Sequence, residues 1–387
     1  MVGYRSDMTP SPLAVRAGNG PSAARRAGPE PATGRAVGRA RYNEPMARPA
    51  DAPQARTIKE IAAVAGVSKS TVSRVLNDTP GVSPKARELV QSAIDRTGYQ
   101  PNRAARSLVT RATGSIGLVV SEAHARIFSD PFFASMVRGA TQVVRPLGIH
   151  LVLMLAEDQR ARDQLLDYLR HGHVDGVLFV STHAADPLPR ILVAERLPAV
   201  LSARPVSRLP ISYVDVDSVA GAGLAVDHLV ERGRRRIATI TGPQDMPAGQ
   251  DRLRGWREAL DAHGLPAGPE LVAHGDFDRG SGARAMEDLL ARGVDFDAVF
   301  VASDLMALDA MTVLREHDLR VPDDVAVVGF DDSVAATQAR PALTTVRQPV
   351  EEMAKALTLT LLDRIGDPDA PITSRVFPPK LIPRGSS

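Results

Sequence analysis

The sequence predicts two structural parts, an all-α helix-turn-helix headpiece and a larger α/β core built on parallel sheets. Two patterns predict them: three short amphipathic segments fall between residues 57 and 98, and after Gly114 short apolar runs alternate with helical segments. The charges agree, because residues 56–113 carry ten Lys or Arg against four acids, whereas residues 114–387 carry 29 basic and 37 acidic side chains. A basic module on an acidic body is typical of nucleic-acid binding.

The composition excludes several classes of protein. The chain has 387 residues, 44% of them apolar, which is enough for two or three packed domains. It has no cysteine, so disulfides, thiolate metal sites and cysteine nucleophiles are excluded. No apolar run approaches the ~20 residues of a membrane helix, and the N-terminus lacks the apolar core of a signal peptide. We therefore expect a cytoplasmic protein without membrane contact.

Residues 1–55 are expected to form a disordered extension. They are rich in Ala, Pro, Gly and Arg, and they have too few large aliphatic side chains to offset chain entropy. Met46 lies just before the part expected to be ordered, and we expect that translation starts there. In the alternative interpretation, the arginine-rich extension is an arm that touches DNA.

The headpiece begins with a capping box. The Thr57 side chain is expected to accept from the amide of Glu60, whose carboxylate reaches back. A second helix follows the break at Gly66-Val67 and is capped by Ser68. A third starts at Ser83-Pro84 and ends at Gly98. The expected inner faces are Ile61, Val64 and Ala65; Val72, Val75 and Leu76; and Leu89, Val90, Ala93 and Ile94.

The core is expected to contain parallel sheets covered on both faces, because strand and helix patterns alternate. The expected strands are Ile116–Val120, Ile149–Leu155, Gly176–Val180, Ala199–Leu201, Ile237–Ile240, Ala298–Val301 and Val325–Phe330. The expected helices are Phe133–Leu147, Asp163–Arg170, Val219–Arg232, Asp251–His263, Ser281–Ala291 and Leu305–His317.

The second headpiece helix is the candidate DNA reader. In a helix-turn-helix this helix enters the major groove with its N-terminal residues against base edges, and here these are Lys69, Ser70 and Arg74. Arg74 suits bidentate contact with guanine, while the hydroxyls of Thr71 and Ser73 suit phosphate. The alternative is a solvated three-helix bundle whose polar face has no function.

The headpiece motifs resemble those of the lactose-repressor (LacI/GalR) family. They run through Thr57–Ala62 (TIKEIA), Ala65–Ser68 (AGVS), Thr71–Asn77 (TVSRVLN) and Gly98–Asn102 (GYQPN). The resemblance implies a regulator that binds a near-palindromic operator in double-stranded DNA as a homodimer, with repression as the default. The headpiece residues expected at DNA are Thr57, Ser68, Lys69, Ser70, Thr71, Ser73, Arg74 and Asn77.

The resemblance also implies a hinge helix that folds on the operator. The expected headpiece is 56–101 and the expected hinge and linker 102–113. Asn102 would cap the hinge helix, Arg103 and Arg106 would meet phosphate, and Leu108 would wedge into the minor groove and kink the duplex. In the alternative, Leu108 packs on the core as an ordinary linker residue.

For the core, the resemblance implies a periplasmic-binding-protein-like domain of two Rossmann-like lobes, with the chain crossing between them three times. Residues 114–387 are expected to bind the effector and to dimerise. We assign about 114–216 and 321–349 to lobe 1, and about 217–320 and 350–387 to lobe 2. The effector, a sugar or related metabolite, is expected between the lobes, where the carboxyl ends of the strands meet.

Arg252 and Asp304 are the leading effector contacts. Arg252 follows the strand end at Gly242-Pro243 and offers a fork of donors, while Asp304 follows another strand end and can accept from two hydroxyls. For each, the alternative is an interlobe or helix-cap role. Phe132 and Phe133 lie near the expected cleft mouth, where one ring could stack on the ligand while the other belongs to the core.

Three departures from the family pattern leave the ligand unidentified. Ala203 stands where an aspartate that often contacts the effector is usual, and Ser218 replaces an asparagine at the lobe crossing. Extra residues around His124 and Arg126 lengthen the loop at the cleft mouth.

Enzyme and metal patterns are weak. Gly221-Ala222-Gly223 lacks the third glycine of a dinucleotide fingerprint. We interpret His171 and His173 as surface residues. We interpret Asp331-Asp332 as a structural pair at the lobe junction. We expect no catalytic residue, cofactor or metal. A soluble enzyme of doubly wound fold and a stand-alone sugar-binding protein are the competing functions. Our hypothesis is a cytoplasmic, nucleoid-associated regulator whose operator affinity is controlled by the effector.

Overall fold

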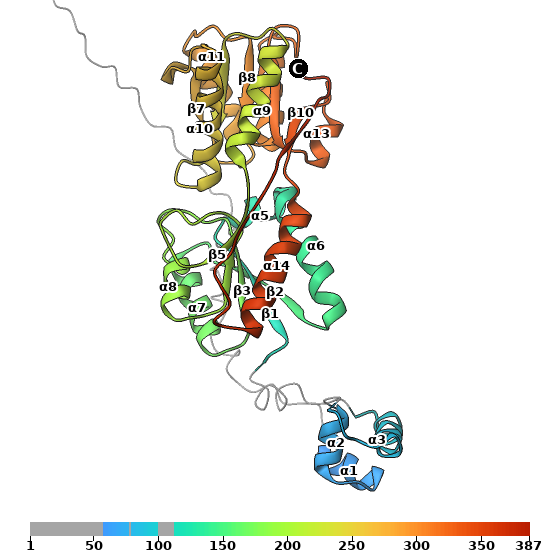
Figure 1. Ribbon diagram of the computed structural model, residues 1–387. Helices are drawn as coiled ribbons and strands as arrows, with labels where there is room; N and C mark the ends of the chain where they lie inside the picture. Colours follow the sequence, from blue (N-terminus) through green and yellow to red (C-terminus); the bar gives the residue numbers. More distant parts are fainter. Residues whose placement is uncertain (1–56, 77–78, 100–111) are drawn as a thin grey trace, which may run out of the picture.

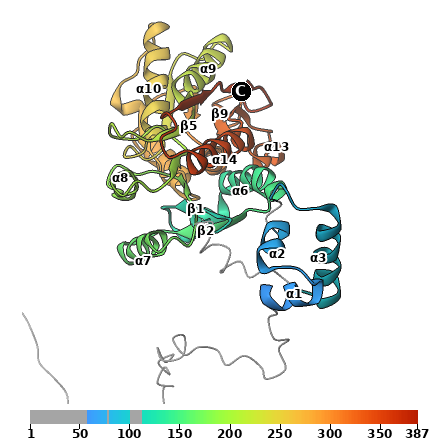
Figure 2. The same cartoon turned by 60° about the horizontal axis from the view of Figure 1, so that its bottom comes forward.

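The computed structural model describes residues 57–76, 79–99 and 112–387, which form a small helical bundle and two α/β lobes (Figure 1). The bundle consists of α1 (Ile58–Ala65), α2 (Lys69–Leu76) and α3 (Pro84–Thr97), which pack on one another (Figure 2). The expected helix-turn-helix headpiece is therefore confirmed. None of the helices in the described parts is long and apolar enough to cross a membrane.

The predicted caps are present. The Thr57 Oγ1 accepts from the amide of Glu60 at 3.3 Å, and the Glu60 carboxylate accepts from the amide of Thr57 at 2.8 Å. Ser83 caps α3 through the amide of Ala86 at 3.3 Å. Gly66 and Gly98 end α1 and α3 in the left-handed region, with φ of 64° and 62°, which a glycine adopts without steric cost.

The headpiece core is narrower than expected. Ile61, Val72 and Val90 are fully buried, but Val64 and Leu89, which we expected on the inner faces, are 44% and 43% exposed. Three short helices enclose only a thin apolar stripe, and these two side chains lie at its edge. Their assignment to the inner faces is wrong.

Lobe 1 contains a six-stranded parallel sheet in the order β11-β5-β4-β3-β1-β2. Helices α6 and α14 lie side by side on one face (Figure 1, Figure 2), and α7 and α8 cover the other. Its strands are β1 (Ser115–Val120), β2 (His150–Leu155), β3 (Val177–Val180), β4 (Ala199–Leu201), β5 (Ser212–Val216) and β11 (Ser374–Phe377). Its helices are α5 (His124–Ser129), α6 (Pro131–Val144), α7 (Gln159–Arg170), α8 (Leu188–Ala194) and α14 (Val350–Gly366).

Lobe 2 repeats this layout in the order β12-β10-β9-β8-β6-β7, with only the short β12 antiparallel. Helices α9 and α10 pack together on one face, and α11 and α12 on the other. Its strands are β6 (Ile237–Thr241), β7 (Val272–His274), β8 (Ala298–Val301), β9 (Ala326–Asp331), β10 (Thr344–Arg347) and β12 (Lys380–Ile382). Its helices are α9 (Ser218–Glu231), α10 (Pro247–Ala262), α11 (Ser281–Ala291), α12 (Asp304–Glu316) and α13 (Val334–Gln338).

The chain crosses between the lobes after β5, after β10 and after β11. The expected assignment of 321–349 to lobe 1 is wrong, because β9 pairs with β8 in the second sheet and β10 pairs with β9. The expected assignment of 350–387 to lobe 2 is wrong over most of its length, because α14 packs on α6 and β11 pairs with β5. Only β12 and the chain end return to lobe 2.

Candidate functional site

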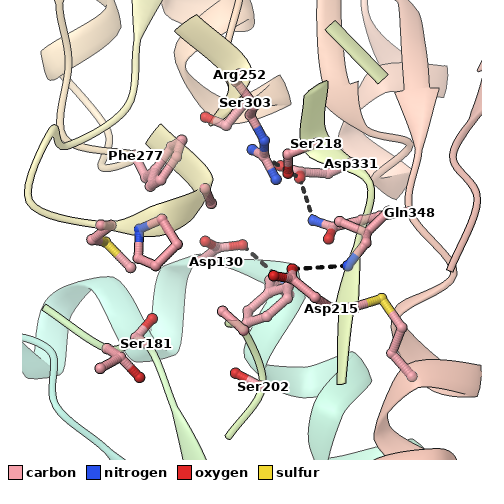
Figure 3. Close-up of a pocket in the computed structure, with 18 of the residues that line it drawn as sticks. Asp130, Ser181, Ser202, Asp215, Ser218, Arg252, Phe277, Ser303, Asp331 and Gln348 are labelled. Atoms are coloured by element: carbon pink, nitrogen blue, oxygen red, sulfur yellow. Dashed lines mark hydrogen bonds and ion pairs between the residues drawn. The ribbon is translucent and has the colours of Figure 1, made fainter. Parts of the chain in front are cut away.

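A cleft opens between the lobes at the carboxyl ends of their strands, the place where parallel sheets bind ligands (Figure 3). It contains about 690 Å³ of space free of protein atoms, part of it open to solvent. Both lobes line this inner cleft, through Arg126, Asp130, Phe132, Ser181, Thr182, Ser202, Ala203, Asp215, Ser218, Met246, Arg252, Phe277, Ser303, Asp331 and Gln348, among others.

Arg252 is the central cation of the inner cleft. It projects from α10, is only 5% exposed, and lies over the Phe330 ring at 3.7 Å from the ring centroid. Its Nη1 donates to the carbonyl of Ala302 at 2.5 Å, while its Nε has no hydrogen-bond partner. A buried donor without a partner costs free energy, so Arg252 would gain from a ligand that accepts this proton.

Three carboxylates face the same space. Asp130 and Asp215 come from lobe 1 and Asp331 from lobe 2 (Figure 3). Burial raises the pKa of Asp130 and of Asp215, and burial raises the pKa of Asp331 well above its ordinary value although Arg252 opposes the rise. Each of these carboxyl groups already accepts at least one hydrogen bond from the protein, and hydroxyl groups of a ligand could donate to the remaining lone pairs.

Asp331 lines the cleft, so our interpretation of the Asp331-Asp332 pair as structural holds for only one of its members. Asp331 adopts φ 121°, a strained conformation for a residue with a side chain, and accepts from Gln348 at 2.6 Å. Asp332 faces away and pairs with Arg347 at 2.6 Å and with Arg384. These ion pairs hold the strained turn that directs Asp331 into the cleft.

Asp304 does not line the inner cleft. It is fully buried at the start of α12, where its Oδ1 accepts from the Thr345 hydroxyl at 2.5 Å and its Oδ2 from the amide of Ser333 at 2.7 Å. Both oxygens are therefore already engaged within lobe 2. In this structure Asp304 has the helix-cap role that we named as the alternative, its contact with the effector stays a prediction, and the preceding residue, Ser303, lines the cleft.

The two phenylalanines lie in different surroundings, as we expected. Phe132 lines the inner cleft, whereas Phe133 is 4% exposed and packs in the core of lobe 1. Ala203 and Ser218, the two departures from the family pattern, also line the cleft. Ser218 has a buried hydroxyl without a partner, so both substitutions alter the surface that a ligand meets.

Two ion pairs join the lobes beside the cleft. His183, which follows β3, contacts Asp245 of lobe 2 at 2.8 Å and Glu122 of lobe 1 at 3.2 Å. The bond to Glu122, together with Asp245, raises the pKa of His183 to about 9 against the effect of burial, so the ring is charged at neutral pH. The second pair joins Arg204 of lobe 1 to Asp251 of α10 through two bonds of 2.9 Å.

The headpiece presents a polar helix surface on α2. Lys69, Ser70 and Arg74 are exposed, while Val72 and Val75 anchor the opposite face in the bundle. The Ser68 hydroxyl accepts from the amide of Thr71 at 3.1 Å, which fixes the first turn of α2. Thr57 has the corresponding capping role at α1, and Ser73 is half-buried.

Several expected site residues lie outside the described part of the chain: Asn77, Asn102, Arg103, Arg106 and Leu108. His171 and His173 stack with ring centroids 6.2 Å apart at the end of α7. Within the described ranges, no group of three or more His, Asp or Glu side chains is placed to hold a metal ion.

Comparison with known families finds two matches. Residues 57–102 match the model of bacterial regulatory proteins, lacI family, and residues 226–387 match the periplasmic binding protein-like domain. The first match covers the three headpiece helices, and the second covers lobe 2 from within α9 onward, together with α14 and β11.

Known proteins match along most of the chain. The HTH-type transcriptional regulator CelR of Thermobifida fusca is 48% identical over 82% of this chain and 94% of its own. A solved complex of the transcriptional regulator CelR with cellobiose has 44% identity and a TM-score of 0.70, covering 86% of this chain and 100% of that one. The lac repressor dimer bound to operator and the anti-inducer ONPF has 28% identity and a TM-score of 0.75, covering 86% and 99%.

Proposed function

The chain belongs to the LacI family of bacterial regulatory proteins. On that premise we propose that it is a repressor whose affinity for its operator is lowered or raised by a sugar bound in the inner cleft. As a member of that family it is a DNA-binding transcriptional regulator. The relatives reported above are regulators, so we propose no enzymatic activity. Its place of action would be the nucleoid, in the cytoplasm.

DNA would be read by α2. Its exposed Lys69, Ser70 and Arg74 lie on the first two turns, the part of a recognition helix that reaches base edges. Arg74 is the residue suited to guanine, since its guanidinium can contact O6 and N7 together. Thr71, Ser73 and the capping residues Thr57 and Ser68 would fix the helix against phosphates. On the sequence resemblance alone, further contacts with DNA would come from Asn77 and from the hinge residues Asn102, Arg103, Arg106 and Leu108.

The working unit would be a homodimer on a near-palindromic operator. The lac repressor neighbour is a dimer bound to operator. Two copies related by a twofold axis present two α2 helices to two half-sites, so the DNA must share that symmetry.

The inner cleft fits a neutral ligand rich in hydroxyl groups, and the orphaned Nε of Arg252 among three carboxylates is the observation that carries this assignment. An anion would find three carboxyl groups around Arg252, whereas hydroxyls can both donate to these carboxyl groups and accept from Arg252. Phe132 and Phe277 add apolar surface of the kind on which the C–H face of a sugar ring packs. Cellobiose, present in the CelR complex, is the first sugar to test.

Entry of a sugar would require the lobes to part. Residues of both lobes enclose the inner cleft, and the ion pairs of His183 and Arg204 join the lobes beside it. The closed arrangement held by His183 and Arg204 would therefore be the state that clasps a ligand.

The test is calorimetric titration of the full chain with cellobiose, together with selection of operator fragments from random duplex DNA. Cellobiose is expected to bind and to change operator affinity, and Arg252→Met is expected to abolish both effects while operator binding without sugar remains. Arg257→Met is the control, because Arg257 is exposed on the same helix. Selection of no DNA, with or without sugar, would contradict the DNA-binding role, and wild-type sugar affinity in Arg252→Met would contradict the cleft assignment.

A further inference from the structure

The loop that is lengthened after β1 folds into α5 and, with lobe 2, encloses a second cavity at the cleft mouth. This outer cleft contains about 1080 Å³ of space, including open solvent, and is lined by Glu122, Arg126, His183, Asp245, Asp278 and Arg279, among others. Lobe 1 supplies the first three and lobe 2 the rest, so the outer cleft, like the inner one, forms where the lobes meet.

Arg126 of α5 separates the two cavities and lines both. Its guanidinium lies 5.4 Å from the centroid of the Phe277 ring and pairs with Glu122 at 2.5 Å. Because the same side chain forms part of each wall, the inner and outer clefts are adjacent.

Two residues that line the outer cleft carry buried polar atoms without a hydrogen-bond partner. The Arg126 side chain is 10% exposed, and its Nε has no partner. Asp278, which follows Phe277, has a buried Oδ1 without a partner. The Arg126 Nε is a donor and the Asp278 Oδ1 is an acceptor. A hydroxyl group can both accept and donate, so two neighbouring hydroxyls of a sugar could supply both missing partners.

We infer that the outer cleft is a second sugar subsite, which takes the second and later units of a β-linked gluco-oligosaccharide whose first ring lies in the inner cleft. The inference rests on the proposed sugar-binding function. It assigns chain-length specificity to α5, Asp278 and Arg279, and it makes the natural effector an oligosaccharide that enters end-on rather than a single ring. The charges suit a neutral chain, because Glu122 and Asp245 are already engaged by His183.

The experiment compares glucose, cellobiose and cellotriose by calorimetry on the full-length protein, with glucose measured by displacement. Two restored hydrogen bonds would make cellobiose bind about ten-fold more tightly than glucose. Because the outer cleft opens to solvent, cellotriose is expected to bind at least as tightly as cellobiose. An enclosed single-compartment site would reject it.

Asp278→Asn and Arg279→Ala are expected to remove most of the difference between cellobiose and glucose and to leave glucose binding unchanged. Arg284→Ala, at an exposed arginine on α11 outside the lining, is the control. The inference is overturned if both variants keep the wild-type ratio, or if cellotriose binds about ten-fold more weakly than cellobiose. Absence of binding by all three sugars, with operator binding intact, would instead overturn the proposed sugar-binding function itself.

Discussion

The interlobe contact of His183 predicts a specific pH dependence of stability. His183 is held between Glu122 and Asp245, and its side chain is 28% exposed. Replacement by glutamine, His183→Gln, keeps a hydrogen-bonding group but removes the charge. The variant therefore isolates the contribution of the protonated ring to the folded, closed state.

The magnitude follows from the pKa. A rise from the ordinary 6.5 to about 9 corresponds to about 3.4 kcal/mol at about 1.36 kcal/mol per pKa unit. Solvent screening of this partly exposed group reduces the value to about 1.5 kcal/mol. Because the folded-state pKa is raised, the stabilisation is complete below pH 6.5 and is lost as the pH rises through about 9.

The assay is guanidinium unfolding of the full chain at pH 6 and pH 9.5, followed by fluorescence of Trp256, the single tryptophan, which is buried in lobe 2. His183→Gln is expected to lose about 1.5 kcal/mol at pH 6 and less than about 0.5 kcal/mol at pH 9.5. His317→Gln is the control, because its pair with Glu287 is exposed on both sides and contributes little. A difference between wild type and His183→Gln that does not change with pH would refute the reasoning.

Three further predictions concern other parts of the molecule. Arg74→Ala should reduce discrimination between the selected operator and single-base variants by about 1–3 kcal/mol in competition binding, and unchanged discrimination would exclude base reading by Arg74. Gly221→Ala should destabilise lobe 2 in thermal unfolding, because the new Cβ would lie 2.7 Å from the Phe330 ring, whereas Gly223→Ala faces open space and should be neutral or stabilising. Asp304→Ala should lower the free energy of unfolding in guanidinium by about 2–4 kcal/mol, because the Thr345 hydroxyl and the Ser333 amide would lose their acceptor. Loss of cellobiose binding without loss of stability would instead show that Asp304 reaches the ligand.

Local chemistry made the headpiece and the central strands predictable. The cap at Thr57, the left-handed glycines and the continuous apolar runs of β1, β3 and β8 each carry their own signal. Helix α14 was missed because its threonines weaken the helical pattern, although Thr358 and Thr360 return their hydroxyls to carbonyls four residues earlier, at 2.7 and 2.9 Å. The short edge strands β11 and β12 have exposed residues and no apolar run.

The lobe boundaries and much of the site could not be predicted, because they depend on pairing between distant segments. The sequence of residues 344–347 alone does not indicate that β10 pairs with β9 rather than with a strand of lobe 1. Arg252 was found because it follows a strand end, and Asp304 was named for the same reason, yet α12 turns its carboxylate toward Thr345. Asp331 was missed as a cleft residue because its orientation depends on an unusual φ, which sequence patterns do not reveal.

The strand β1 connects the cleft to the headpiece side of lobe 1. At its start, Asp175 accepts from the amides of Thr113 and Gly114 at 2.6 and 2.9 Å, and this clamp holds the chain where it enters the lobe. At its end, β1 leads to Glu122 and α5, which line the outer cleft. A movement of lobe 1 about the cleft therefore carries the clamped residues with it as a rigid body.

Loss of the clamp should uncouple ligand from DNA without harming either site. Asp175→Ala is expected to keep the wild-type affinity for cellobiose in calorimetry and for operator without sugar. The change of operator affinity on adding cellobiose, about 5- to 150-fold for an ordinary allosteric coupling, is expected to shrink toward unity, because lobe 1 no longer holds the entering chain. Equal coupling in wild type and Asp175→Ala would mean that the signal reaches the headpiece by another route, such as contacts between the two copies of the dimer.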